Sequence, residues 1–185
     1  MVLIFKSWPL LNTMTTYAIL WTASDITQEL VVSKKDHVDW GKTARIGTTG
    51  ACVIAPLVLT WIRIVELMFP GSAMKMVLKK VVIEQICFTP VTISSFYLAT
   101  NALEGKSGIP ELEAKFKKTY QAGMTFWPFV QMVNFRFVSH HYKPVFTASA
   151  SFVWTIFLCY MKEEKVQAEP EQPSKAFLQS LPAKD

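Results

Sequence analysis

Several charged and amide side chains of this 185-residue sequence lie inside or beside long apolar stretches. Such a group is costly in hydrocarbon, so it normally faces a partner, the interior of a helical bundle or a water-filled cavity. Two kinds of chemistry use groups placed in this way: a polar path for ions or small solutes, and hydrogen bonds that join helices. The residues are Asp25, Gln28, Arg63, Glu84, Gln85, Gln131 and Asn134.

Two interpretations of these residues stay open at the level of sequence. In the first, they converge on a polar path through a bundle. In the second, Arg63 pairs with Glu66 and Lys80 pairs with Glu84 within single helices near the lipid headgroups. The amide side chains would then only join one helix to another.

The segment from Thr125 to Tyr142 places its polar groups on one helical face. Trp127, Gln131, Asn134, Val138 and His141 fall at i, i+4, i+7, i+11 and i+14, with phenylalanines beside them. This spacing predicts a helix with lipid on one side and a polar bundle interior on the other. Proline is comfortable at the first position of a helix but kinks its interior. The Trp-Pro pair therefore predicts a partial or kinked helix.

No pattern in the sequence indicates catalysis, a metal or a cofactor. The spacings typical of zinc proteases, paired-cysteine sites, phosphate loops and nucleophile elbows do not occur in it. Cys52, Cys87 and Cys159 lie singly in apolar windows, which predicts buried packing residues, with redox sensitivity as the alternative. We expect a protein that is not an enzyme and uses no cofactor.

Five windows free of Asp, Glu, Lys and Arg must position these residues, and each is 17 to 19 residues long. A helix that crosses a bilayer needs about 20 apolar residues. The sequence is 51% hydrophobic and 18% charged, with a mean hydropathy of +0.26, which favours a membrane protein over a soluble all-α bundle. The windows are Trp8–Ser24, Ile46–Ile62, Gln85–Leu103, Thr119–Phe135 and Pro144–Met161.

The predicted fold is an all-α integral membrane bundle. It has about four transmembrane helices, the partial or kinked Trp-Pro helix, and an amphipathic helix on the membrane surface or on the bundle. Ile109, Leu112, Phe116 and Tyr120 recur on one face and indicate that amphipathic helix.

One membrane-embedded domain is expected at residues 1–162, followed by a polar, disordered tail at 163–185. The net charge of +5 is spread over the connections, which favours lipid headgroups over nucleic acid as the partner. With four spans, eight Lys and Arg residues fall on each side of the membrane, so the positive-inside rule gives no orientation.

Ordered motifs from about Trp8 to Met161 resemble those of the Mpv-seventeen and 22-kDa peroxisomal membrane protein family, most closely its Mpv-seventeen-like branch. The element Asp25-Ile-Thr-Gln28 is similar to the family's motif at the end of its first span. Departures from the family pattern include Ser24, Ala55 and Glu84. The other residues that carry the resemblance are Pro56, Trp61, Pro90, Trp127, Pro128, Gln131, Asn134, Phe135 and Trp154.

The resemblance implies a small multi-pass organelle membrane protein, in the mitochondrial inner membrane or alternatively the peroxisomal membrane. It also implies a role in membrane permeability as a channel, in reactive-oxygen metabolism and in mitochondrial homeostasis, including mitochondrial DNA maintenance. The alternative is a non-conducting membrane scaffold. The expected partners are the lipid bilayer, a second copy of the chain, and small solutes or ions in the case of a channel; direct nucleic acid binding is not expected.

Overall fold

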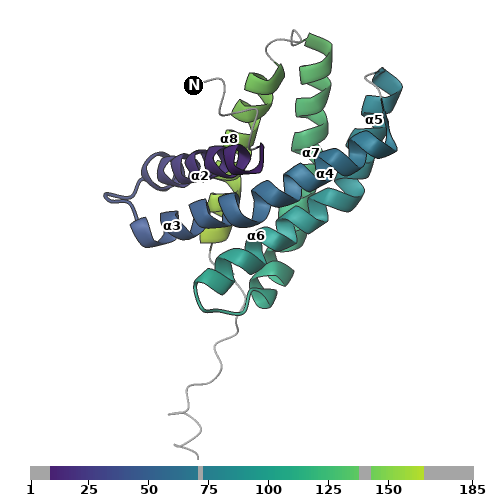
Figure 1. Ribbon diagram of the computed structural model, residues 1–185. Coiled ribbons are helices and arrows are strands. Elements are labelled where there is room, and N and C mark those ends of the chain that lie inside the picture. The colour runs from purple at the N-terminus through teal and green to yellow at the C-terminus, as the bar shows by residue number, and fades with distance from the viewer. Residues whose placement is uncertain (1–8, 71–72, 138–142, 165–185) are drawn as a thin grey trace, which may run out of the picture.

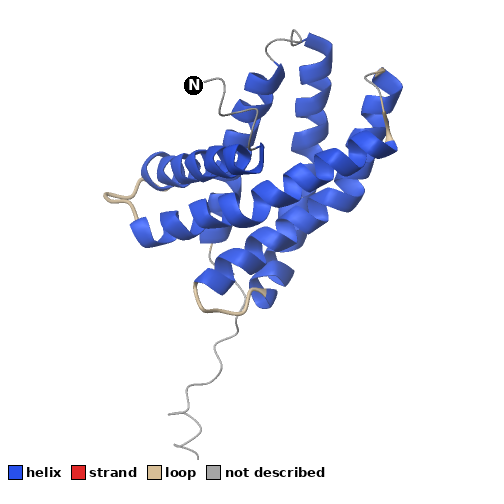
Figure 2. Ribbon diagram, viewed as in Figure 1, coloured by secondary structure: helices blue, strands red, loops and turns tan. Residues whose placement is uncertain are grey.

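The structure is a computed structural model that describes residues 9–70, 73–137 and 143–164. Within these ranges, the side chains of a few residues, including Glu66, Asn134 and Phe135, lie outside the description. The described ranges are helical and contain no strand (Figures 1 and 2). The predicted all-α fold is therefore confirmed.

The described chain forms five continuous helical segments, three of which contain a short π-helical stretch. They are α2 (Pro9–Thr27) with η1 (Gln28–Val32); α3 (Trp40–Thr49), η2 (Gly50–Ile54) and α4 (Ala55–Met68); α5 (Met74–Ile83), η3 (Glu84–Phe88) and α6 (Thr89–Leu103); α7 (Ile109–Phe137); and α8 (Lys143–Glu163).

Two of the π-helical stretches end two residues before a proline, at Pro56 and at Pro90. A proline inside a helix has no N–H to donate, and its ring clashes with the carbonyl group four residues earlier. Widening the preceding turn to a π-helix relieves that clash, and such turns occur at functional sites. Each proline therefore lets one long helix continue with a locally altered turn.

Helix α7 corrects the expected division of its segment into two helices. It runs for 29 residues and passes through Pro128, so the predicted amphipathic helix and the predicted partial or kinked Trp-Pro helix are parts of one helix, which does not begin at the Trp-Pro pair. Membrane helices tolerate an internal proline because neighbouring groups can satisfy the freed carbonyl. The amphipathic face predicted near its start packs on the bundle, since Leu112, Phe116 and Tyr120 contact the hydrophobic core.

The first and last helices run in the same sense through the bundle. The Ser24 hydroxyl of α2 lies 3.3 Å from the carbonyl oxygen of Phe152 in α8, and further along both helices Gln28 contacts Glu163. The second half of the first helical segment therefore packs against the second half of α8.

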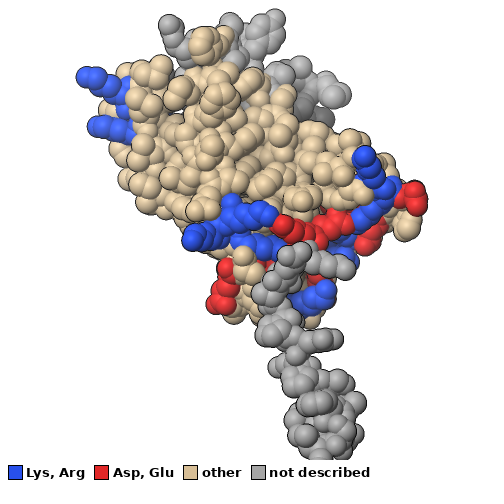
Figure 3. Space-filling view, turned by 180° about the vertical axis from the view of Figure 1, so that it is seen from behind, with Lys and Arg blue, Asp and Glu red and all other residues tan. Residues whose placement is uncertain are grey.

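The interior is aromatic and aliphatic, and large apolar side chains also cover the outside. Trp21, Phe96 and Tyr97 are at most 4% exposed in the core, whereas Leu67, Phe129 and Phe137 lie on the exterior. Figure 3 shows most charged residues of one face gathered in a band, with a few basic side chains at the opposite edge of a broad uncharged surface. Such an exterior suits lipid better than water.

Two helical segments of the described chain are long and apolar enough to cross a membrane. They are Trp40–Val65 and Met74–Leu103, and they contain the second and third charge-free windows of the sequence. At 1.5 Å per residue they measure about 39 and 45 Å, which exceeds the ~30 Å hydrocarbon thickness of a bilayer.

Candidate functional site

One end of the bundle is held together by a cluster of buried and half-buried charges. We call it the ionic cluster; it comprises Asp25, Gln28, Glu29, Lys35, Lys42, Asn101, Glu104, Glu111, Lys115, Lys162 and Glu163. The residues come from α2, η1 and the loop after it, α3, α6 and its C-cap Glu104, α7 and α8. The cluster therefore joins all five helical segments.

Lys42 is the central cation of one half of this cluster. Its ammonium group lies 3.0 Å from Asp25 Oδ1 and 3.1 Å from Glu29 Oε1, and both carboxylates are completely buried. The Thr43 hydroxyl donates to Asp25 Oδ2 at 2.7 Å. A buried carboxylate is stable only when it is paired and hydrogen-bonded. Lys42 therefore stabilises the ionised forms of both buried acids at the end of the first helical segment.

The local fold places Lys42 through a helix cap. The Asp39 side chain accepts a hydrogen bond from the Lys42 backbone N–H at 3.0 Å and so starts α3. That hydrogen bond lowers the pKa of Asp39. The Asp39 backbone N–H in turn donates to Glu29 Oε2 at 2.8 Å, which ties the start of α3 to η1.

Glu163 connects the last helix to this half of the cluster. Its carboxylate accepts a hydrogen bond from Gln28 Nε2 at 2.6 Å, one from Ser33 at 3.2 Å, and an ion pair from Lys35. The predicted tail was taken to start at residue 163, but Glu163 ends α8 and belongs to the ionic cluster. Residues 165–185, the rest of that tail, lie outside the described residues.

Glu111 is the central anion of the other half. It accepts from Lys115 at 2.8 Å, from Lys162 at 2.6 Å and from Asn101 Nδ2 at 2.5 Å. Burial alone would raise the pKa of Glu111, but these hydrogen bonds outweigh it and lower the pKa. Lys162 also lies 3.5 Å from Glu104, so α6, α7 and α8 share one network.

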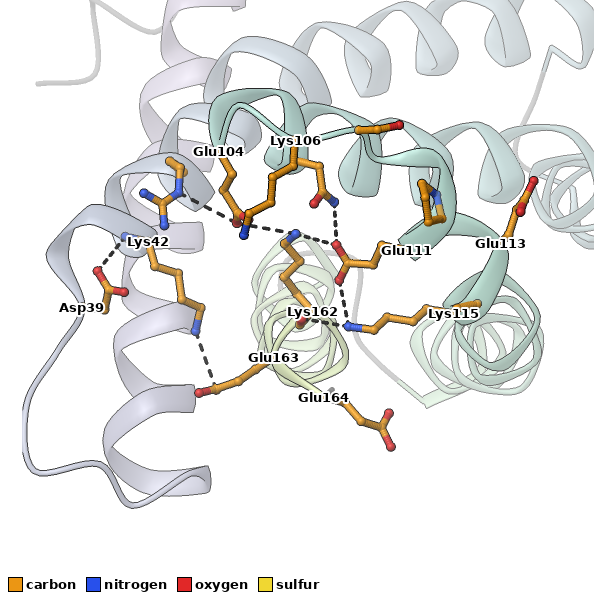
Figure 4. A pocket seen from close by; sticks show the side chains of 15 residues that line it. Asp39, Lys42, Glu104, Lys106, Glu111, Glu113, Lys115, Lys162, Glu163 and Glu164 are labelled. Carbon is orange, nitrogen blue, oxygen red and sulfur yellow. Dashed lines mark hydrogen bonds and ion pairs between the residues drawn. The ribbon is translucent and has the colours of Figure 1, made fainter. Parts of the chain in front are cut away.

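An open pocket of about 1210 Å³ lies against the cluster, and we call it the vestibule. Figure 4 shows acidic and basic side chains alternating around it. The Arg45 Nε atom is buried without a hydrogen-bond acceptor and lies 3.9 Å from Glu104. The lining residues are Asp39, Lys42, Arg45, Asn101, Glu104, Lys106, Ser107, Pro110, Glu111, Glu113, Ala114, Lys115, Lys162, Glu163 and Glu164.

The contacts of Glu163 predict an acid-sensitive fold. Burial alone would raise its pKa, but the hydrogen bonds from Lys35 and Gln28 outweigh burial and lower the pKa to about 2. A carboxyl group with a lowered folded-state pKa stabilises the fold above its unfolded pKa of about 4.3. That contribution is lost as the pH falls toward the folded-state pKa of about 2. We expect Glu163→Gln to be less stable near neutral pH and to lose less stability on acidification.

Thermal unfolding of the protein in detergent, followed by circular dichroism across this pH range, measures both effects. Asp36→Asn is the matched control, because Asp36 is an exposed acid in the neighbouring loop. If Glu163→Gln and the wild type show the same pH dependence, the assignment of acid sensitivity to Glu163 is wrong.

A second space lies deeper in the bundle, which we call the inner cavity. It has a volume of about 260 Å³ and is lined by side chains of α2, α4, η3, α6, α7 and α8 with one residue of η2. Glu84 and Gln131 are among them. The other lining residues are Tyr17, Trp21, Ile54, Val58, Trp61, Ile62, Phe88, Thr89, Thr92, Ile93, Trp127, Ser151, Trp154, Thr155 and Leu158.

The structure divides the sequence-predicted polar residues into separate groups. Asp25 and Gln28 join the ionic cluster, while Glu84 and Gln131 line the inner cavity. Gln85 is buried beside the Thr89 hydroxyl, which lies 3.4 Å from its Oε1. Arg63 is exposed on the exterior of α4, and the side chain of Asn134 lies outside the described part of the structure. In the described chain, these residues therefore do not converge on one common point.

Three signature tryptophans, Trp61, Trp127 and Trp154, line the inner cavity, whereas the signature prolines lie within the helices and are not part of its lining. Trp61 stacks on Phe88 with ring centroids 4.9 Å apart, and Trp127 packs edge-on against Trp154 at 6.1 Å. Pro56 and Pro90 follow the π-helical stretches η2 and η3. Pro128 lies within α7, and the side chain of Phe135 lies outside the description.

The expected burial of the cysteines is correct for one of them. Cys159 is buried, whereas Cys52 and Cys87 are exposed and line the same external groove. Burial was expected because all three lie in apolar windows, but an apolar window also has a face directed at lipid. Cys52 and Cys87 lie on such faces.

Sequence reasoning missed most of the ionic cluster. Glu29, Lys42, Glu111, Lys162 and Glu163 are not among the candidate residues that the sequence singles out, and Glu163 falls in the predicted tail. The signal that could have found them is their position outside the apolar windows. Successive helices bring the ends of several windows together at the same end of the bundle. Only the fold pairs them across sequence separations such as the 51 residues between Glu111 and Lys162.

The apolar exterior, the end cluster of charges and the helical fold define a small all-α membrane protein. Residues 101–159 match the family described as Mpv17 / PMP22. An "Mpv17-like protein" from Xenopus laevis is 34% identical over 163 residues, covering 87% of this chain and 80% of that protein. The chain belongs to the Mpv17 / PMP22 family.

Further relatives agree with this assignment. An "Mpv17-like protein" from Bos taurus is 31% identical over 173 residues, covering 85% of this chain and 87% of that protein. A "Mitochondrial inner membrane protein Mpv17" from Xenopus laevis is 28% identical over 141 residues, covering 73% of this chain and 78% of that protein. No solved structure matches the chain.

Proposed function

We propose that this protein is a permeability pathway for small solutes in the mitochondrial inner membrane. Relatives from Xenopus laevis and Caenorhabditis elegans carry the name of that membrane, and the peroxisomal membrane in the family's description is the alternative location. Effects on reactive-oxygen metabolism and on mitochondrial DNA maintenance would follow from the solutes that the pathway admits.

One observation carries the proposal: along α8 the inner cavity is followed by the vestibule, and along α2 it is followed by the ionic cluster against which the vestibule lies. On α2, Tyr17 and Trp21 line the inner cavity, and Asp25 and Gln28 of the ionic cluster follow one and two turns later on a similar face. The inner cavity is therefore next to the ionic cluster along this helix.

Helix α8 repeats this order. Thr155 and Leu158 line the inner cavity, and Lys162 lines the vestibule one turn later. Trp21 and Leu158, both 4% exposed, belong to the hydrophobic core with Phe96, and in this proposal that core separates the two spaces. The described state would thus be the closed one, with an apolar barrier between the vestibule and the inner cavity.

The vestibule predicts weak charge selection. Its lining carries the cations Lys42, Arg45, Lys106, Lys115 and Lys162 and the anions Asp39, Glu104, Glu111, Glu113, Glu163 and Glu164. A lining in which both signs are interspersed has no strong field of one sign to exclude ions of the other. We therefore expect passage of small solutes with little selection by charge at this end.

Efflux from liposomes that contain the purified full-length protein tests the proposal. We expect a loss of entrapped small solutes that exceeds the loss from protein-free liposomes. We also expect Glu84→Gln to change the ratio of cation to anion permeability, because it removes the charge of the inner cavity. Lys75→Gln, at an exposed site on α5 far from both spaces, should leave that ratio unchanged.

Absence of any efflux across membrane voltage, pH and redox conditions would reject the permeability pathway. The non-conducting scaffold would then be the better account, with the ionic cluster serving only to hold the helices together. Efflux that Glu84→Gln leaves unchanged in selectivity would instead remove the inner cavity from the path.

A further inference from the structure

The wall of the inner cavity is unusually rich in aromatic side chains. Six of its lining residues are aromatic, and they come from α2, α4, η3, α7 and α8. Its volume of about 260 Å³ is below the ~300–1,000 Å³ of pockets that take drug-sized ligands. The space therefore fits a ligand smaller than those. The six residues are Tyr17, Trp21, Trp61, Phe88, Trp127 and Trp154.

Glu84 contributes the single formal charge among the described residues of this wall. No hydrogen bond or ion pair to its carboxylate occurs among the described contacts of the chain. An ionisable group inside a membrane segment normally has a partner. The described protein does not supply one, which leaves that place to a ligand or a proton.

The three threonine hydroxyl groups of the cavity are directed to helix carbonyl groups and not to the Glu84 carboxylate. Thr92 donates to the Thr89 carbonyl oxygen at 3.0 Å, and Thr155 donates to the Ser151 carbonyl oxygen at 2.9 Å. Thr89 lies 3.3 Å from the backbone carbonyl oxygen of Glu84, not from its carboxylate. These hydroxyl protons satisfy their own helices and leave the Glu84 charge uncompensated.

We propose that the inner cavity binds a small organic monocation with an alkylammonium head, such as a trimethylammonium group. The Glu84 carboxylate would supply the counter-charge, and the aromatic side chains would surround the alkyl groups. Aromatic rings attract such cations through their quadrupoles, and the attraction is strongest where water is excluded. Recognition of quaternary ammonium groups in proteins uses this combination.

Other ligand classes fit these walls less well. Hard inorganic cations such as Mg²⁺ and Ca²⁺ take about six or more oxygen ligands, whereas this wall is mainly aromatic and aliphatic. A neutral solute would leave the Glu84 carboxylate without a partner, and an anion would be repelled by it. An alkylammonium ion satisfies the charge and the rings together.

Binding at this site does not require conduction, although its interpretation as a transported solute rests on the proposed permeability. The cation site and the permeability pathway can each be rejected without the other. Binding in micelles without efflux from liposomes would support the cation site and reject the pathway. Efflux without binding would reject the cation site alone.

Equilibrium dialysis of labelled choline against the full-length protein in maltoside micelles tests the proposal, since these micelles contain no quaternary ammonium group. The matched probe is the uncharged carbon isostere, in which a tert-butyl group replaces trimethylammonium. We expect the isostere to bind at least about 10-fold more weakly than choline. Glu84→Gln should weaken choline binding to a similar degree and leave the isostere unaffected.

A pair of substitutions at Trp61 tests the role of the rings. Trp61→Phe keeps an aromatic ring and should retain choline binding within about 3-fold, whereas Trp61→Leu should weaken it by about 10-fold. Circular dichroism and size-exclusion chromatography establish that each variant is folded. Equal binding of choline and its isostere by the folded wild type, or no choline binding, overturns the proposal and leaves a proton as the partner of Glu84.

A choline headgroup could also come from a lipid, and reconstitution separates the two sources. In phosphatidylglycerol vesicles the site should bind free choline as it does in micelles. In phosphatidylcholine vesicles, competition would identify the lipid headgroup as the ligand, and undiminished binding would identify the free cation. Either result supports an alkylammonium site.

Discussion

Replacing Lys42 by methionine is expected to destabilise the protein by about 3–5 kcal/mol, because breaking a buried ion pair leaves an unpaired buried charge. Asp25 and Glu29 are both completely buried and both lie within 3.1 Å of the Lys42 ammonium group. Lys35, at 3.3 Å, would still pair with Glu29, but Asp25 would keep only uncharged donors, the Thr43 hydroxyl and the Cys159 thiol. Unfolding in mixed micelles with increasing dodecyl sulfate measures the change.

A matched lysine at the same end serves as the control. Lys106 pairs with Glu104 at 3.3 Å, but its side chain is 70% exposed, so Lys106→Met should cost about 1 kcal/mol or less. The double variant Lys42→Met with Asp25→Asn should recover part of the loss, because it removes the stranded charge. Equal effects of the two single lysine substitutions would show that the ionic cluster does not stabilise the fold.

Substituting Gly50 by alanine is expected to destabilise the protein by about 1–3 kcal/mol through overpacking. A methyl group on Gly50 would lie 2.6 Å from Cγ and 2.7 Å from Cδ2 of the Trp21 ring. Small residues let membrane helices approach closely, and here the close contact is between η2 and α2. Trp21 also packs edge-on against Phe96 at 5.6 Å, so the ring cannot move away without disturbing the core.

Gly123→Ala is the control for this prediction. A methyl group there would lie 3.3 Å from Trp154 and 3.4 Å from Thr89, which needs only small adjustments. Alanine is favoured over glycine inside a helix by about 0.5–1 kcal/mol, so this variant should be nearly as stable as the wild type or more so. If Gly50→Ala is equally well tolerated in the same unfolding assay, the close contact between η2 and Trp21 is wrong.

The sequence pattern was sufficient for the helical class and for part of the site. Apolar windows mark helices because their length and composition act locally. Asp25 and Gln28 were picked out because polar groups beside an apolar window need partners, and both have them. Glu84 and Gln131 were picked out for the same reason, and the fold brings them to one cavity.

The rest of the site depends on contacts between distant segments. Lys42 and Glu163 look like ordinary solvated charges in their own segments, and only the crossing of α2, α3 and α8 makes them partners. The local sequence also does not tell which side chains of an apolar helix face outward, as the exposed Arg63 and Cys52 show. The continuity of α7 through Pro128 was missed because a proline's effect depends on whether neighbouring groups satisfy the freed carbonyl.

Solute efflux through a variant with a smaller apolar side chain between the two spaces tests the proposed permeability pathway. Leu158 lines the inner cavity one turn before Lys162 of the vestibule, and Leu158→Ala removes apolar atoms at that position. Leu67 is 83% exposed on the exterior of α4, so Leu67→Ala removes the same atoms away from the path. With both variants folded in liposomes, we expect faster efflux for Leu158→Ala and wild-type efflux for Leu67→Ala. Wild-type efflux for both variants would contradict a path that joins the vestibule to the inner cavity.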